Sequence, residues 1–566
     1  MSDLSYSTKY YSDAINLTDI EALEGKLQLL LDQTITSVDV LEKWLFQEGK
    51  LLDEIVEAMN GHAMDFYRDT TNTEKRNIYL HDQTIIHPLL KKFQAAFDKK
   101  FCECPYTLNL DDHKYGLMRK VRSTKLKLFR KENLPLEARE QELGARYSEI
   151  MGSLTVEWNG EERSYSFVKA QVDSNDRNVR ERAWRKLAIA HKQIKPKINE
   201  IMNELINTRT QIAINAGFKN YRDYLFELKN REYSIQDCYH FHQSTENYLI
   251  PAWSKLANVF KLELNLDTYR PWDIGPCALQ GLPFSSFKEL LDGVELMLGK
   301  TDSYFQERFR FMRENGLLDI EERNGKSPGA FCEIFPASKN AFIISNFGPS
   351  FNAVIALIHE MGHALNEYLQ FSNNHVVHDH NRREEVAELY SHSLEFLLMD
   401  KLNIFYTKQD EFKNAQRELL HRGFNMLINP IIGDLFQHWL YTNPNHTPEE
   451  RDSKFFEINK RFMYLPVDTS GLESDIGCSW MNSVHYFKYP FYKIEYAISQ
   501  LGALQLLEIY RENQAIATSL FKQGAGTYSY QSIAKIYQDT GVSFDFSDQT
   551  LKKTARFLDK VISELK

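Results

Sequence analysis

The chain has few of the residues that break secondary structure or cross-link a fold. Its 566 residues include only 25 Gly, 16 Pro and 6 Cys. The scarcity of Gly and Pro argues against sandwiches and barrels, which need frequent turns. The cysteines form no CxxC pair and indicate reduced thiols in a cytoplasm. Because apolar residues recur at helical spacing over long stretches, the sequence predicts a mainly α-helical protein.

Positive charge and long apolar runs are also missing. The net charge of −10 offers no basic surface for nucleic acid or anionic lipid. No span of about 18 uncharged apolar residues occurs, so we expect no membrane-spanning helix. The N-terminus, MSDLSYSTKYYSDAINL, lacks a basic flank followed by an apolar block. We therefore expect no secretory signal and a cytoplasmic protein.

The composition is ample for a packed interior. Apolar residues make up 43% of the chain and aromatic residues 13%. The length is several times a usual domain of about 150 residues, so two or three lobes are plausible. Residues 1–200, which are helical in pattern and rich in charge, are predicted to form an N-terminal helical lobe. Residues 201–566 are predicted to form a second domain.

The segment 352–368, NAVIALIHEMGHALNEY, places the two histidines and the glutamate of HEMGH in an otherwise apolar run. His359 and His363 are four residues apart and lie on one face, so both imidazoles can reach one ion at about 2.0–2.1 Å. Glu360 is displaced by about 100° around the axis, where it can act as a general base on a metal-bound water. Gly362 removes a side chain and lets another backbone lie close against the helix.

Chance alone would produce an HExxH pattern in roughly a few per cent of chains with this many histidines. The surrounding apolar residues predict that the helix is largely buried. Two unpaired histidines and a carboxylate there would cost several kcal/mol without partners. A metal ion is therefore the preferred explanation, with zinc as the ion.

The third metal ligand is expected on a following helix, RREEVAELYSHSLEFLLMDKL. A third histidine at the longer HExxHxxGxxH spacing is absent, because positions 366 and 369 are Asn and Leu. One face of the following helix carries a polar stripe with few basic residues, made up of Glu384, Glu388, Ser391, His392 and Glu395. An ordinary solvated face would also produce such a stripe. We predict Glu388 as the third ligand, with Glu384 or Glu385 orienting a ligand histidine.

One short segment departs from the helical pattern. GAFCEIFPASKNAFIISNFGPSF, from Gly329, has β-branched and aromatic residues around a turn-like ASKN, which predicts a hairpin with its later strand at 341–346. A strand edge beside the helix could hold a peptide in extended form by main-chain bonds. The predicted substrate-binding residues are Ala341, Phe342, Ile343, Ile344, Ser345, Asn346 and Gly348.

These motifs resemble the oligoendopeptidase F branch of the thimet oligopeptidase-like zinc metallopeptidases. The resemblance covers roughly residues 200–550. It is carried by HEMGH (359–363), E-x6-E (Glu388 to Glu395), HYFKYPFYKIEYAISQLGA (485–503), AGFKNYRDYLFELKN (216–230) and GAFCEIFPASKNAFIISNFG (329–348). It implies two helical lobes around a deep substrate channel, with a small β-sheet next to the zinc helix. It also implies one Zn²⁺ per chain, held by His359, His363 and Glu388, and cleavage of short peptides with Glu360 as the base.

The segment 485–503 contains a histidine and several tyrosines around a proline. Pro490 is suited to start a helix, which would place Tyr492 and Tyr496 on one face with His485 just before them. Most of the 29 tyrosines must be packing residues. With the resemblance, Tyr496 is expected to donate a hydrogen bond to the oxyanion of peptide hydrolysis. His485 and Tyr492 are expected to contact the substrate or the oxyanion, and Tyr489 is a weaker candidate.

Two alternatives remain open from the sequence. A carboxypeptidase or dipeptidyl carboxypeptidase would use the same zinc centre and grip the C-terminal carboxylate of its substrate with Arg382, Arg383 or Lys488. A scaffold protein would instead hold a structural zinc with four ligands, yet no Cys or fourth His falls naturally into the cluster. The nearby His375, His378 and His380 occupy a polar loop and are expected to be solvated. A monomer is plausible.

Overall fold

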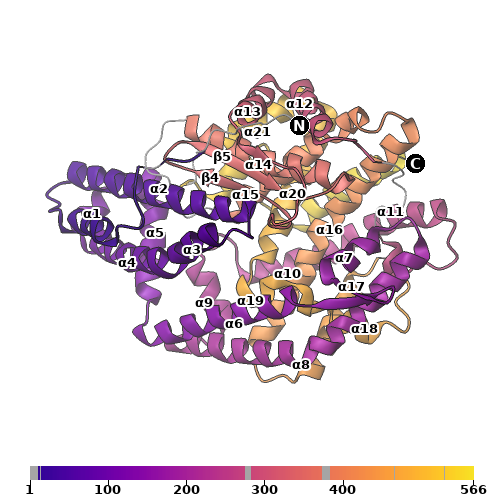
Figure 1. Cartoon of the computed structure of the whole chain (residues 1–566), viewed down its shortest axis with the longest axis horizontal. Helices are drawn as coiled ribbons and strands as arrows, with labels where there is room; N and C mark the ends of the chain where they lie inside the picture. Colours follow the sequence, from indigo (N-terminus) through magenta and orange to yellow (C-terminus); the bar gives the residue numbers. More distant parts are fainter. Residues whose placement is uncertain are drawn as a thin grey trace. The chain divides into compact units, whose positions relative to one another are not determined.

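The computed structural model describes residues 10–12, 14–274, 282–372, 383–464, 466–527 and 530–565. The chain is mainly helical, with one two-stranded and one three-stranded sheet among these residues, so the predicted fold class is confirmed (Figure 1). None of the described helices is long and apolar enough to cross a membrane.

The chain divides into two compact units, and each unit is assembled from separate stretches of sequence. The first consists of Met1–Lys127, Leu282–Thr407 and Gly502–Phe544, and the second of Leu128–Gly281, Lys408–Leu501 and Asp545–Lys566. The domain division expected at residue 200 and the deep channel stay predictions.

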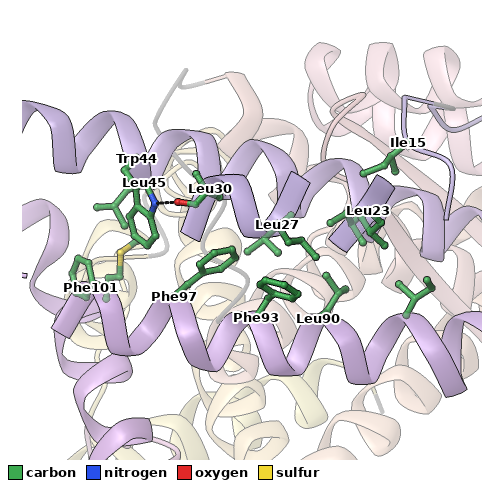
Figure 2. Close-up of a cluster of buried hydrophobic side chains, with 14 of the residues drawn as sticks. Ile15, Leu23, Leu27, Leu30, Trp44, Leu45, Leu90, Phe93, Phe97 and Phe101 are labelled. Atoms are coloured by element: carbon green, nitrogen blue, oxygen red, sulfur yellow. Dashed lines mark hydrogen bonds between the residues drawn. The ribbon is translucent and has the colours of Figure 1, made fainter. Parts of the chain in front are cut away.

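The N-terminal helices of the first unit share a dense apolar core. These helices are α1 (Ile20–Asp32), α2 (Val38–Arg68), α4 (His87–Glu103) and α5 (Asp112–Leu128), whereas α3 (Thr73–His81) contributes no buried side chain. Figure 2 shows leucines of α1 facing the phenylalanines of α4, with Trp44 of α2 beside them. The indole Nε1 of Trp44 donates a hydrogen bond to the carbonyl oxygen of Leu30 at 2.9 Å, which satisfies the indole N–H inside the core.

The three-stranded sheet of the first unit has the order β3-β5-β4. Its strands are β3 (Leu318–Asp319), β4 (Ala330–Phe335) and β5 (Asn340–Ser345). β4 and β5 form the predicted antiparallel hairpin, with the later strand one residue earlier than expected. The expectation that this later strand is an open edge is wrong, because β3 pairs with it in parallel at Ile343 and Ile344. The edge strand of the hairpin is β4.

Two adjacent helices follow the hairpin and carry the motifs of interest. α14 (Phe351–Ser372) packs on β4 and β5, and α15 (Glu384–Leu397) packs on α14. Gly362 permits this approach, because a Cβ atom built there would lie only 2.5 Å from the Cα atom of Ser391 and 2.7 Å from the carbonyl oxygen of Tyr390. The expectation that Gly362 admits a neighbouring backbone is therefore confirmed.

Other helices of the first unit hold this pair in place. They are α12 (Phe287–Thr301), α13 (Ser303–Glu314), α21 (Gln514–Ala525) and α22 (Ile533–Asp539), with the C-terminal part of α20 (Lys493–Glu512). Asn366 of α14 donates from Nδ2 to the carbonyl oxygen of Ala525 at 2.9 Å. The Tyr537 hydroxyl donates to the carbonyl oxygen of Glu385 at 2.8 Å. Each of the two motif helices is thus fixed by its own buried hydrogen bond.

The second unit is built largely from long helices and a small hairpin. Its elements are α6 (Leu134–Gly152), β1 (Thr155–Trp158), β2 (Glu161–Ser164), α7 (Tyr165–Ala170), α8 (Arg177–Asn215), α9 (Tyr221–Leu228), α10 (Ile235–Ser244), α11 (Ile250–Glu263), α16 (Gln409–Thr442), α17 (Pro448–Phe462), α18 (Glu473–Gly477), α19 (Val484–Lys488), the start of α20 and α23 (Asp548–Glu564). The fully buried Arg209 of α8 donates to the carbonyl oxygens of Tyr486 and Phe487 at 2.7 and 2.6 Å. The guanidinium therefore anchors α19, which carries His485, to the long helix.

The close approach at Gly362 yields a stability prediction. Gly362→Ala should lower the free energy of unfolding by about 1–3 kcal/mol, because the new methyl group forces the α14 and α15 backbones apart. Denaturant titration measures the change. Gly25→Ala is the matched control, since no heavy atom lies within 4 Å of a Cβ built at this helical glycine. Equal stabilities of the two variants would contradict the packing described here.

Candidate metal centre

α14 and α15 bring two imidazoles and a carboxylate together inside the first unit. The Nε2 atoms of His359 and His363 lie 3.5 and 3.8 Å from Oε2 of Glu388. The three side chains are largely buried, and their ligand atoms all lie within 4.8 Å of one another. Zinc–ligand bonds of about 2.0–2.1 Å would place tetrahedral ligand atoms about 3.3 Å apart. The donor types and their spacing therefore fit a zinc ion.

A second carboxylate fixes the orientation of one imidazole. His359 Nδ1 lies 2.7 Å from Oε1 of Glu395, one of the two glutamates of the E-x6-E pattern. With its proton on Nδ1 shared with this carboxylate, the ring would offer Nε2, which faces Glu388, to a bound metal ion. The Ser391 hydroxyl donates to Oε2 of Glu388 at 3.2 Å and restrains the other end of the site.

The sequence had suggested Glu384 or Glu385 for this orienting role, and for these two residues the role stays a prediction. Both lie in the first turn of α15. The sequence placed Glu395 in the polar stripe without a role of its own. A signal was available, because Glu395 is seven residues after Glu388 and so lies on the same face of the helix.

The electrostatics of the pocket favour positive charge between its carboxylates. Burial alone would lower the pKa of His359, but hydrogen bonds to Glu388 and Glu395 outweigh it and raise the pKa to about 10. Burial alone would raise the pKa of Glu388, but the neighbouring charges of His363 and His359 hold it well below its ordinary value. A buried site with this preference suits a cation.

Glu360 and His392 complete the surroundings. Glu360, one residue after the first histidine, is only 7% exposed. Nε2 of His392 lies 3.8 Å from Oε2 of Glu388 and has no hydrogen-bond partner among the described residues. His392 could form an alternative group with His359 and Glu395. The 2.7 Å contact occupies Nδ1 of His359, so the set that uses its Nε2 atom is the better donor set.

The aromatic residues predicted in 485–503 form a cluster in the second unit. The His485 ring lies 5.7 Å from the Tyr492 ring and 5.8 Å from the Tyr496 ring, and the two tyrosine rings are 5.0 Å apart. All three side chains are partly exposed. Burial, and then the charge of Lys493, lowers the pKa of His485 to about 4, so its imidazole is neutral at pH 7.

The predicted start of the helix at Pro490 is wrong. α20 begins at Lys493, because Phe491 adopts a left-handed backbone with φ of 57° that no α-helix can include. The buried Phe491 N–H donates to Oε1 of Gln437 at 3.0 Å, which helps to hold this strained turn. Tyr492 therefore precedes the helix, although its ring still meets that of Tyr496.

The predicted substrate-binding strand lies deep in the first unit. Ala341, Phe342, Ile343, Ile344 and Ser345 are buried within β5, and Asn346 and Gly348 follow it. Their contact with a peptide stays a prediction.

The basic residues of the exopeptidase alternative are only partly described. The Arg383 guanidinium donates to the carbonyl oxygen of Gln531, and Lys488 is exposed. Arg382, His375, His378 and His380 lie outside the described residues.

Comparisons with known proteins agree with the fold. A model described as Peptidase family M3 matches residues 170–536. Oligopeptidase PepF of Bacillus subtilis (strain 168) is 21% identical over 69% of this chain and 59% of its own length, which is less than two thirds of that relative. Group B oligopeptidase PepB of Streptococcus agalactiae serotype III (strain NEM316) is 21% identical over 75% of this chain and 74% of its own.

A solved structure shares the fold over nearly the whole chain. The putative oligoendopeptidase F from Bacillus anthracis str. Ames aligns with a TM-score of 0.83 at 21% identity, covering 100% of this chain and 99% of that one. The resemblance to the oligoendopeptidase F branch is thus confirmed.

The contact between His359 and Glu395 generates a prediction about metal affinity. Glu395→Gln should weaken metal binding by about 10–100-fold, because the amide no longer holds the Nδ1 proton as a carboxylate does. Competition with a chromogenic chelator measures the change. Glu385→Gln is the matched control, a buried glutamate on the same helix. If only Glu385→Gln lost metal affinity, Glu385 rather than Glu395 would be the residue that orients a ligand histidine, as predicted from the sequence.

Proposed function

The chain belongs to Peptidase family M3, and from this premise we propose that it is a zinc-dependent endopeptidase that hydrolyses internal bonds of short oligopeptides. The observation that carries the proposal is the convergence of His359, His363 and Glu388 within 4.8 Å, with a buried glutamate adjacent on α14. Three protein ligands are the number that catalytic zinc sites use, since the fourth position must take water or substrate.

Each residue of the centre has a distinct task. A bound Zn²⁺ would supply Lewis-acid polarisation of the substrate carbonyl and make water more acidic. Glu360 accepts a proton from the attacking water and then delivers it to the departing amine. Glu395 keeps the His359 ring in the tautomer and orientation that present Nε2 to the metal.

The aromatic cluster of the second unit supplies the remaining chemistry in this proposal. Tyr496 donates a hydrogen bond from its phenolic O–H to the oxyanion that forms as the peptide carbonyl is attacked. His485, which is neutral at pH 7, and Tyr492 contact the substrate or the oxyanion. Support for this role comes from the mutual contacts and partial exposure of the three rings.

A peptide blocked at both ends tests the reaction and its base together. The wild-type protein should cut an N-acetylated, C-amidated peptide at an internal bond and lose activity with a chelator. Glu360→Gln should keep the metal and lower kcat by about 10²–10⁴-fold, because the proton acceptor is gone. Mass spectrometry of the products and metal analysis of the variant measure these outcomes.

Glu367→Gln is the control for this experiment, since Glu367 is also buried on α14 and has no proposed role. It should retain activity. An enzyme that leaves the blocked peptide intact but removes C-terminal residues from the free peptide would be the carboxypeptidase or dipeptidyl carboxypeptidase instead. Near-normal turnover by Glu360→Gln would remove Glu360 from the mechanism.

The oxyanion role gives a separate prediction. Tyr496→Phe should lower kcat by about 10²–10³-fold with little change in KM, because the lost hydrogen bond acts mainly in the transition state. Steady-state kinetics on the blocked peptide measure it. Tyr489→Phe is the control, since Tyr489 contacts the same cluster but is 51% exposed. Unchanged kcat in Tyr496→Phe, with a loss in Tyr492→Phe, would transfer the role to Tyr492.

A further inference from the structure

A second cluster of metal-ligand side chains lies in the second unit and has no part in the proposed reaction. Helix α10 contributes Cys238 and His242, and helix α16 contributes Asp434 and His438. Within each pair the residues are four apart, so both side chains leave the same face of their helix. The two faces meet, and the four side chains converge in the core between α10 and α16.

The donor atoms are close together and fully enclosed. Nε2 of His242 and Nε2 of His438 lie 3.0 and 3.1 Å from the same oxygen, Oδ2 of Asp434. A ligand atom from each of Cys238, Asp434 and His438 lies within 4.8 Å of the other two. No side chain of the four is more than 2% exposed. These distances approach the spacing of about 3.3 Å expected for ligands of a tetrahedral zinc.

Hydrogen bonds within the cluster satisfy only some of its buried polar atoms. Nδ1 of both histidines and Oδ1 of Asp434 are buried without a hydrogen-bond partner among the described residues. The rings of Tyr239 and Phe491 lie 4.9 and 5.3 Å from the His438 ring and make this side of the cluster apolar. An aspartate bonded to two imidazoles explains the Nε2 contacts but gives no role to the thiol.

Charge balance gives the thiol a role. A thiolate, a carboxylate and two neutral imidazoles around a divalent cation sum to zero, which a buried site requires. Burial, and then the charge of Asp434, raises the pKa of the Cys238 thiol, whereas the charge of Arg231 favours the thiolate. Arg231 is itself paired with Glu495 at 3.0 Å, so its charge is already shared.

We propose that Cys238, His242, Asp434 and His438 form a second metal site, which holds a zinc-type divalent cation in a closed set of four ligands. One thiolate, two imidazoles and a carboxylate are ligands that zinc accepts. Four protein ligands leave no position for water, so this ion is structural and links α10 to α16. The inference does not depend on the proposed peptidase reaction, because it concerns other residues and another unit.

The cluster lies next to the turn at Phe491 that precedes Tyr492. His438 is adjacent to Gln437, whose side chain accepts the N–H of Phe491 at 3.0 Å. Phe491 stands in the left-handed turn directly before Tyr492, and its ring packs on that of His438. An ion that fixes His438 on α16 therefore also supports the turn that presents the tyrosines.

Cobalt substitution of the full-length protein tests the proposal directly. After chelation and refilling with Co²⁺, the wild-type protein should bind two equivalents and show a sulfur-to-cobalt charge-transfer band in the near ultraviolet. The centre on α14 and α15 contains no sulfur, so only the second site can give this band. Cys238→Ser should lose the band, and Cys478→Ser should keep it, since Cys478 is another buried cysteine of the same unit.

Two further variants separate the outcomes of the two sites. His363→Gln should lose one equivalent of cobalt and retain the band. His438→Gln should lose the band, whereas His421→Gln, which replaces another buried histidine of α16, should retain it. A folded wild-type protein without the band overturns the second site, whatever its activity. A full band together with two equivalents in His363→Gln would instead contradict the catalytic centre.

Discussion

The close contact between α14 and α15 at Gly362 is the constraint on which the rest of the site depends. With no side chain at this position, the backbone of Ser391 can lie against α14. Glu388 lies three residues before Ser391, nearly one turn earlier, and that spacing brings its carboxylate to the two imidazoles. A methyl group at position 362 would force the two helices apart and move the Glu388 carboxylate away from the imidazoles. No other described element supplies that carboxylate.

Burial strengthens the electrostatic interactions between the side chains of this site. His359, His363, Glu388 and Glu395 are largely buried on α14 and α15, so water screens their charges only weakly. The carboxylates face the imidazoles, and the pocket stabilises positive charge between them. A divalent ion between these side chains would satisfy this preference. Membership in Peptidase family M3 agrees with such a centre.

The features predicted from the sequence were those that depend on local periodicity. Four-residue spacing of His359 and His363, and the polar face that carries Glu388, follow from the geometry of a single helix. Features that depend on how elements meet were harder. The orienting contact of Glu395 requires the relative rotation of two helices, and the loss of the β5 edge results from a strand of only two residues, β3. Phe491 prevents an earlier start of α20 because its backbone is left-handed, and a phenylalanine in the sequence does not indicate that conformation.

The cluster of Cys238, His242, Asp434 and His438 illustrates the same limit. Each half is a pair at helical spacing, and neither pair is conspicuous until α10 and α16 are seen to pack together. The pair of His359 and His363 is conspicuous because a glutamate follows its first histidine in a long apolar run. Sequence patterns thus reveal sites that one helix largely defines, and miss sites divided equally between distant segments.

The central claim is that His359, His363 and Glu388 share one cation. Crystals grown with zinc and measured on both sides of the zinc absorption edge would test it most directly. The account predicts an anomalous peak at zinc–ligand bonding distance from Nε2 of each histidine and from a carboxylate oxygen of Glu388. A peak bonded to the imidazoles with the Glu388 side chain turned away, or no peak between α14 and α15, would contradict it.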